Sequence, residues 1–369
     1  MIDDPIVAAA ARVVVGLLGA LLAGGAVRSA VRTLVLPRAV QDSVSRILFR
    51  TLRAVYDLRL RHLSDYGSRD RLMAAFAPLG LLLMLPLWLA IVLLGFGGLF
   101  WASGVRPVGR ALVLSGSSLF TLGFERADGW LPMILTFTEA TIGLILVALL
   151  IAYLPTIYGA FARRERAVNM LTVRAGRPVS AVEMLTRLHR VAGLESIGPM
   201  WSEWEAWFAE VEESHTALAA LVFFRSPHPQ ESWVTAAGTV MDTSALLLSA
   251  VDTPRQPEAA LCVRAGFVAL RHIADYFDLP YDHNTTYPEH PISITRAEFD
   301  DCLQQLAEVG VPLKADREQA WLDYAGWRVN YDEPLLALAS LVMAPIAPWT
   351  SDRSPASGRA VPRFSAPRG

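Results

Sequence analysis

A short polar strip, residues 115–124, reads SGSSLFTLGF and lies between two long apolar segments of the chain. Its hydroxyl side chains and two glycines are unsuited to continuing an apolar helix, but they offer oxygen atoms and backbone freedom. Non-helical backbone is tolerated at membrane depth only where protein buries it or where it lines a water-filled cavity. Oxygen atoms in such a place can replace the water around a dehydrated cation.

The composition is typical of a membrane protein. Of 369 residues, 53% are hydrophobic and 18% are charged, whereas soluble domains have about 25% charged residues. A helix needs ~20 residues to cross the hydrocarbon core of a bilayer. Three segments are long enough, and the acidic start of the first is atypical of a cleaved signal peptide. The predicted spans are residues 6–27, 72–101 and 130–153.

The arginines predict the orientation of these spans. Residues 28–71 contain ten arginines and residues 161–177 contain five, whereas the 102–129 connection contains three. By the positive-inside rule, the two basic segments lie in the cytoplasm, and the N-terminus and the polar strip lie outside. We therefore expect a multi-pass protein of the plasma (inner) membrane, in contact with membrane lipids.

We expect an all-α membrane protein with three transmembrane helices, a re-entrant pore helix and filter loop, and a cytoplasmic all-α domain. The predicted regions are an N-terminal transmembrane helix (1–27), a basic cytoplasmic amphipathic segment (28–71), a pore domain (72–160), a cytoplasmic helical domain (161–348) and a disordered tail rich in Pro, Ser and Arg (349–369).

The basic segment carries apolar residues at helical spacing, with arginines between them. This pattern indicates an amphipathic helix on the inner membrane surface. A cytoplasmic extension of the first span that packs on its neighbours fits the pattern as well, and the sequence does not separate the two. The apolar positions are Val40, Val44, Ile47, Leu48, Leu52 and Val55.

The cytoplasmic region shows helical runs separated by Pro and Gly. Thr295 followed by Glu298 predicts a capping box, and Trp204, Trp207 and Phe208 have the spacing of a buried helical stripe. The runs lie near 179–193, 200–224, 230–251, 256–278, 295–309 and 315–331.

Residues 108–120 are apolar enough to re-enter the membrane. At ~1.5 Å per residue they are too short to span it, and Pro107 suits the first turn of a helix. The order of a span, a short re-entrant helix, a polar strip and another span predicts an ion path lined by the carbonyls of the strip. Because one chain contributes one strip, we expect four copies around an axis, a homotetramer.

Residues 72–160 resemble the pore module of the two-transmembrane potassium channel family. Thr121-Leu122-Gly123-Phe124 falls where that family has Thr-Val/Ile-Gly-Tyr/Phe. The resemblance implies a carbonyl filter at these residues, K⁺ as the permeant ion, and a hinge in the third span near Gly143. Pro155 could bend the same span at its cytoplasmic end, because proline interrupts the helical hydrogen bonds.

Glu125 departs from the family pattern, which has a second glycine at this position. Either the outermost carbonyl layer has a different geometry, or Glu125 forms a ring of carboxylates that attracts cations at the outer mouth. The departure favours a cation channel more strongly than a strictly potassium-selective one.

Glu139 is an ionisable residue inside the third span and hence a functional candidate. It shares a helix face with Gly143 and could face a central cavity. The alternative, which we favour slightly, is a hydrogen bond to pore-helix serines or backbone that braces the filter from behind, because four close carboxylates would raise one another's pKa.

No enzyme activity is expected, since no catalytic motif is found. Glu212 and His215 have a spacing that could bind metal, but without further ligands we expect ordinary surface and cap histidines and no metal site. We also expect no cofactor and no nucleic-acid partner, and the ligand of the cytoplasmic domain is not predicted. The alternative functions are a weakly selective cation channel and a non-conducting membrane-anchored signalling or structural protein with a degenerate pore motif.

Overall fold

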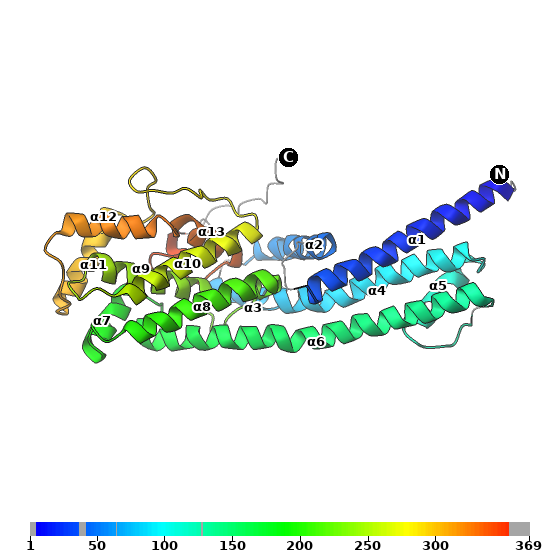
Figure 1. The fold of residues 1–369 in the computed structure, drawn as a ribbon, viewed down its shortest axis with the longest axis horizontal. Helices are drawn as coiled ribbons and strands as arrows, with labels where there is room; N and C mark the ends of the chain where they lie inside the picture. The colour runs from blue at the N-terminus through cyan, green and yellow to red at the C-terminus, as the bar shows by residue number, and fades with distance from the viewer. Residues whose placement is uncertain (1–4, 37–41, 64, 127, 354–369) are drawn as a thin grey trace. The chain divides into compact units, whose positions relative to one another are not determined.

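The computed structural model describes residues 5–36, 42–63, 65–126 and 128–353 (Figure 1). Secondary structure in these ranges is helical, apart from turns and one isolated bridge between Val251 and Leu313. The predicted all-α class is therefore confirmed for the described residues. The chain forms two compact units, one comprising Met1–Ser64 and Leu72–Tyr158, the other Asp65–Arg71 and Gly159–Gly369.

Three helices are long and apolar enough to cross a membrane. α1 (Pro5–Leu34) and α4 (Phe76–Ala102) lie within the first unit, and α6 (Trp130–Ala175) continues from it into the second. α1 extends past the predicted end of the first span at residue 27. α6 has 46 residues and runs uninterrupted through Pro155, which corresponds to ~69 Å of helix.

Small residues bring α1 and α4 into close contact. A Cβ atom added to Gly95 would lie 2.7 Å from the carbonyl oxygen of Gly19, and one added to Gly19 would overlap the carbonyl oxygen of Gly95. Ala23, Ala26 and Ala30 of α1 are buried. Close approach of backbones through small residues is the usual way in which apolar helices associate in a membrane.

A polar chain of hydrogen bonds joins the C-terminal end of α1 to its neighbours. Trp88 of α4 donates through Nε1 to Ser29 Oγ at 2.9 Å, and Ser29 donates to Asp42 Oδ2 at 2.6 Å. Asp42 also caps α2 (Ser43–Leu60), because its carboxylate accepts the amides of Val44 and Ser45. The entry into α2 is thereby fixed against α1 and α4.

α2 packs on the first turns of α4. Its buried residues are Leu52, Tyr56 and Leu60, and the rings of Phe49 and Tyr56 lie 6.0 and 5.4 Å from the ring of Phe76. Packing on neighbours is one element of the second alternative for the basic segment, but α2 is a helix separate from α1 and its opposite side is exposed. Part of that segment, residues 37–41 with Val40, lies outside the described residues.

The second unit is a helical domain built around α9 (Trp233–Ser249), in which every residue except Leu248 is buried. α7, α10, α12 and α13 contact α9, and α8 packs against α10 (Figure 1). The surrounding helices are α7 (Ala181–Val191), α8 (Gly198–Ala217), α10 (Pro257–Tyr276), α11 (Arg296–Glu308), α12 (Arg317–Arg328) and α13 (Asp332–Val342).

Two local predictions in this domain are confirmed and one is wrong. Thr295 and Glu298 form a capping box at the start of α11, and Trp204, Trp207 and Phe208 of α8 are buried. His215, expected at the surface, is fully buried. Its ring fits there because it contacts the ring of Trp233, with centroids 4.6 Å apart.

The packed domain continues past residue 348, where the disordered tail was predicted to begin. Thr350 and Ser351 are buried, and Ser351 begins a short 3-10 helix, η2 (Ser351–Arg353). A Cβ atom added to Gly238 of α9 would overlap Cγ2 of Thr350. The rest of the predicted tail, residues 354–369, lies outside the described residues.

The chain passes between the two units three times, before and after Asp65–Arg71 and again after Tyr158. Both Asp65–Arg71 and the later part of α6 are bound within the helical domain. The segment before α4 includes α3 (Tyr66–Ala74), where Asp70 forms a buried ion pair with Arg225 at 2.9 Å. In α6, buried Arg164 donates to the carbonyl oxygens of Leu221 and Phe224 at 2.9 and 2.7 Å. The helical domain therefore holds both connections through arginines, half-buried Arg225 and buried Arg164.

Candidate functional site

The segment predicted to be a pore helix forms α5 (Val108–Leu119), a 12-residue helix between α4 and α6. Its length of ~18 Å is too short to cross a bilayer. α5 packs against α4, where Leu112 fills the space that a side chain at Gly97 would occupy and Ser115 Oγ lies 2.9 Å from the carbonyl oxygen of Leu93.

The predicted filter, Thr121–Glu125, is attached to the end of α5 through its backbone amides. Thr121 donates to the carbonyl oxygen of Ser118 at 3.0 Å, and Leu122 donates to that of Ser117 at 2.8 Å. The amide of Glu125 donates to Ser117 Oγ at 3.2 Å. Within the described parts of the chain, no group donates to the carbonyl oxygens of residues 121–124. The amides of Thr121, Leu122, Gly123 and Glu125 are thus bound to the end of α5, while the carbonyl oxygens of residues 121–124 keep their acceptor capacity.

The filter has an irregular backbone with two residues in the left-handed region. Gly123 has φ +73°, which glycine adopts readily. Thr121 has φ +54°, which is strained for a residue with a Cβ atom. Leu122 and Phe124 leave 61% and 65% of their side-chain surface exposed. These two large apolar residues thus remain uncovered within a single chain.

Glu125 is paired with an arginine of the predicted pore helix. Arg110 Nε lies 2.8 Å from Glu125 Oε1, and Asp128 Oδ2 lies 3.6 Å from the same guanidinium group. The carboxylate that ends the filter is therefore held beside a cation from its own chain. A ring of free carboxylates, one of the two alternatives from the sequence, would require this ion pair to open.

Glu139 lies directly behind α5. It is fully buried, and its Oε1 lies 2.5 Å from Ser115 Oγ. This is a contact with a pore-helix serine, as the bracing alternative requires. Ser115 Oγ lies within hydrogen-bond distance of both the carbonyl oxygen of Leu93 and Glu139 Oε1, so its one hydrogen is shared between two acceptors. Glu139 Oε2 has no partner among the described residues.

Gly143 is the point where α6 comes closest to the end of α5. A Cβ atom at Gly143 would overlap the carbonyl oxygen of Leu119. Close packing alone therefore explains the glycine, without the predicted hinge. Glu139 and Gly143 are one helical turn apart, and both contact α5, so this segment of α6 packs against the helix that precedes residues 121–125.

The helical domain contains a buried ionic cluster that the sequence did not indicate. Arg328 contacts both oxygens of Asp242, at 2.7 and 2.8 Å, and contacts Asp332 at 2.7 Å. Tyr324 and Tyr331 donate to Asp242 at 3.2 and 2.8 Å. Because every charged group has its partners, the cluster is a structural element of the core.

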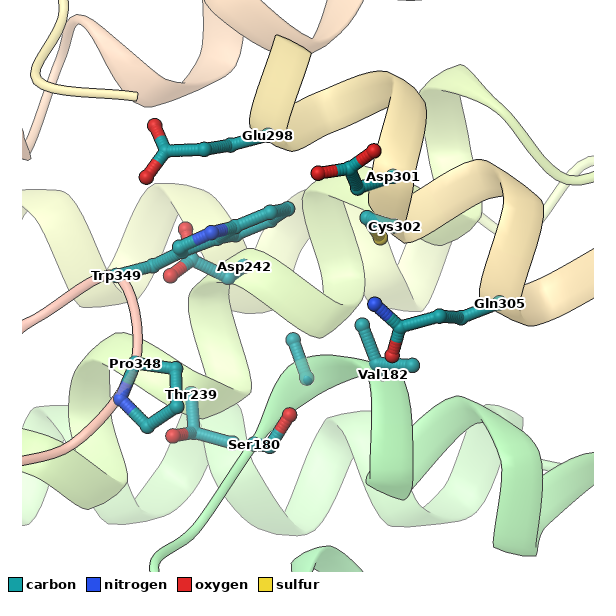
Figure 2. Close-up of a pocket in the computed structure, with 11 residues that line it drawn as sticks. Ser180, Val182, Thr239, Asp242, Glu298, Asp301, Cys302, Gln305, Pro348 and Trp349 are labelled. Atoms are coloured by element: carbon teal, nitrogen blue, oxygen red, sulfur yellow. The ribbon is translucent and has the colours of Figure 1, made fainter. Parts of the chain in front are cut away.

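Figure 2 shows a cavity of about 290 Å³ beside this cluster. Trp349, the first turn of α7 and one face of α11 with Asp301 and Gln305 surround it. Its other carboxylates are already paired: Asp242 with Arg328, and Glu298 with Arg353, whose hydrogen bond lowers the pKa of Glu298 to about 2. Among the described residues, no group of three His, Cys, Asp or Glu side chains could hold a metal ion.

No family model, no curated protein and no solved structure matches this chain. The function is therefore inferred from the geometry described above. The residues that carry the inference are Thr121, Leu122, Gly123, Phe124 and Glu125 in the filter strip, with Glu139, Gly143 and Pro155 on α6.

Proposed function

We propose that this chain is one subunit of a tetrameric membrane cation channel and that K⁺ is its main permeant ion. Dehydrated ions pass the carbonyl oxygens of residues 121–124, helped by the hydroxyl of Thr121. The observation that carries the proposal is the attachment of the filter. The amides of residues 121–123 donate to carbonyl oxygens of α5, and the carbonyl oxygens of residues 121–124 accept no hydrogen bond from described residues. The strip lies between α4 and α6, two helices that are apolar enough to span a membrane.

The tetramer follows from the coordination of a dehydrated ion. One filter strip supplies oxygen atoms from one side only, so copies around an axis are needed to replace a hydration shell. The exposure of Leu122 and Phe124 supports the same arrangement, because neighbouring subunits would cover these side chains. The arginine distribution supports an outer position for the filter and a cytoplasmic position for the helical domain.

Gating in this proposal is a movement of α6, near Gly143 or Pro155, under the control of the helical domain. α6 is continuous from the filter support at Glu139 to the buried Arg164. A change in the helical domain would thus reach the filter region through a single rigid element. The ion pair of Asp70 with Arg225 gives the domain a second connection, to the segment before α4.

Two features support the alternative functions. The pairing of Glu125 with Arg110 leaves the outer end of the filter unlike a glycine-ended one, which supports a weakly selective cation channel. The strained backbone of Thr121 supports a non-conducting, membrane-anchored signalling or structural protein whose pore motif is degenerate. The first alternative conducts Na⁺ as well as K⁺, and the second conducts neither.

The test is ionic current through the purified full-length protein in a planar bilayer under a K⁺ gradient. Gly123→Ala should abolish the current, because alanine is strained at φ +73°. Gly109→Ala is the matched control, since nothing lies within 4 Å of a Cβ atom added in this helical position. Absence of current, or a current that Gly123→Ala leaves unchanged, contradicts the proposal. A reversal potential far from that of K⁺ supports the weakly selective channel.

A further inference from the structure

α2 has a second apolar face, opposite to the face that packs on α4. Ile47, Val55 and Leu58 leave 64%, 52% and 60% of their side chains exposed. Together with Thr51 and Ala54, which are also exposed, they follow the spacing of one side of a helix. Leu52, Tyr56 and Leu60 form the buried side.

An exposed arginine flanks this stripe on each side. Arg50 lies beside Ile47 and Ala54, and Arg59 lies beside Val55. We call Ile47, Arg50, Val55, Leu58 and Arg59 the outer face of α2. An aliphatic stripe between two arginines matches the boundary between acyl chains and phosphate groups, where arginine stems cover apolar surface and guanidinium groups bind phosphate oxygens.

The place of α2 in the fold puts this face at the end of two candidate spans. Asp42 ties the start of α2 to Ser29 at the C-terminal end of α1. Phe49 fills the space beside Gly80 of α4, and Tyr56 contacts Phe76 at the beginning of the same helix. α2 thus starts beside Ser29, near the C-terminal end of α1, and runs toward Phe76 at the beginning of α4. If α1 and α4 cross the membrane, α2 lies along the end of both helices that meets the lipid headgroups.

We propose that the outer face of α2 binds anionic phospholipids of the inner leaflet, with its aliphatic residues at the acyl boundary and Arg50 and Arg59 on the phosphates. Lipid is favoured over a protein partner because the face combines exposed aliphatic side chains with charge of one sign, next to helices that already require lipid. The proposal rests on the membrane position of α1 and α4 and does not depend on ion conduction.

The two native cysteines make a direct test possible. Cys262 and Cys302 are both buried, so a cysteine introduced at the surface can be labelled selectively. We would introduce Val55→Cys, attach a bimane fluorophore, and reconstitute the full-length protein in vesicles of phosphatidylcholine with or without phosphatidylglycerol. Val191→Cys is the matched control, because Val191 is 87% exposed on α7 of the helical domain.

Lipids with brominated acyl chains should quench the label at position 55 strongly and the label at position 191 weakly. Brominated phosphatidylglycerol should quench at a lower mole fraction than brominated phosphatidylcholine. Each arginine should contribute about fivefold to the preference for phosphatidylglycerol. In the double variant Arg50→Gln/Arg59→Gln, the two brominated lipids should therefore quench at the same mole fraction. The protein should keep its fold, since both side chains are exposed.

Two outcomes would overturn the proposal. If the label at position 55 is quenched only by an aqueous quencher, the outer face is in contact with water. If neither lipid nor aqueous quencher reaches it, another protein surface covers α2. Neither fluorescence measurement depends on ionic current. Absence of current in a planar bilayer would therefore contradict the proposed channel without contradicting the lipid-binding proposal.

Discussion

Arg110 and Glu125, the first on α5 and the second at the end of the filter strip, form an ion pair with Nε and Oε1 2.8 Å apart. The pair joins the first turn of α5 to the end of the strip, 15 residues later in the chain. It therefore sets both the charge and the position of the outer end of the proposed filter.

Removing the arginine should leave an unneutralised carboxylate on every subunit. Arg110→Gln is expected to raise the cation current at low ionic strength by roughly two- to tenfold, because a negative mouth concentrates cations. The gain should disappear near 1 M salt, where the Debye length is about 3 Å. Single-channel recording across a salt series measures the effect, and Arg110→Gln with Glu125→Gln should restore the original current. An increase that persists in high salt would point to a changed filter shape.

The contact of Glu139 with Ser115 requires an acceptor oxygen at this position and no charge. Glu139→Gln, which keeps the shape and an oxygen that accepts from Ser115, should retain tetramers and conduction. Glu139→Ala leaves a cavity and should cost about 1–3 kcal/mol with reduced current. Thermal unfolding in detergent and unitary current are the measurements. If Glu139→Gln abolishes conduction while Glu139→Ala does not, the carboxyl group acts directly in the ion path.

Gly143 should be intolerant of a methyl group for steric reasons. Gly143→Ala forces the backbone of Leu119 to move and should destabilise the first unit by about 1–3 kcal/mol. Gly159→Ala in the same helix is the control, because the only neighbour of its added Cβ atom is Arg163 Nη1, at 3.6 Å. A Gly143→Ala variant with unchanged stability but altered opening would favour the predicted hinge.

His215 should make the helical domain sensitive to acid. Its Nδ1 lies 2.8 Å from the carbonyl oxygen of Val211 and its Nε2 lies 3.1 Å from Arg164 Nη1, so the ring is neutral and accepts from the arginine. Burial, followed by the charge of Arg164, holds the pKa of His215 well below its ordinary value of 6.5.

Below pH 6.5 the unfolded chain takes up a proton at His215 and the folded domain does not. Stability therefore falls as the pH decreases from 6.5, by up to about 1.4 kcal/mol per pH unit from this group. Urea denaturation of the full-length protein at pH 7.5, 6.5 and 5.5 measures the slope. His215→Gln should flatten it, whereas His283→Gln, at an exposed position, should not.

The features predicted correctly from the sequence are those that depend on residues close together in the chain. The capping box of Thr295 and Glu298 needs only four residues, and the spacing of Trp204, Trp207 and Phe208 is visible within one helix. α13 was missed because Asp332–Val342 is buried on nearly every side, and such a helix shows no polar face.

Contacts between residues that are far apart in the sequence could not be predicted from such local patterns. Arg328 and Asp242 are 86 positions apart, and nothing in either local sequence marks them as partners. The proposed filter is a second example. Its position was predicted from the polarity of the strip and the lengths of the flanking segments, whereas the pairing of Glu125 with Arg110 depends on how the strip folds back against α5. Burial of a charge depends on its partner, and the partner is set by the fold.

The contact between Gly238 and Thr350 imposes an order on the biogenesis of the protein. Thr350 is synthesised more than one hundred residues after Gly238, and α9 stays partly uncovered until it arrives. The three long apolar helices leave the ribosome before this point and are available to the insertion machinery while α9 still exposes apolar surface. Until Thr350 arrives, the apolar surface of nascent α9 is open to aggregation.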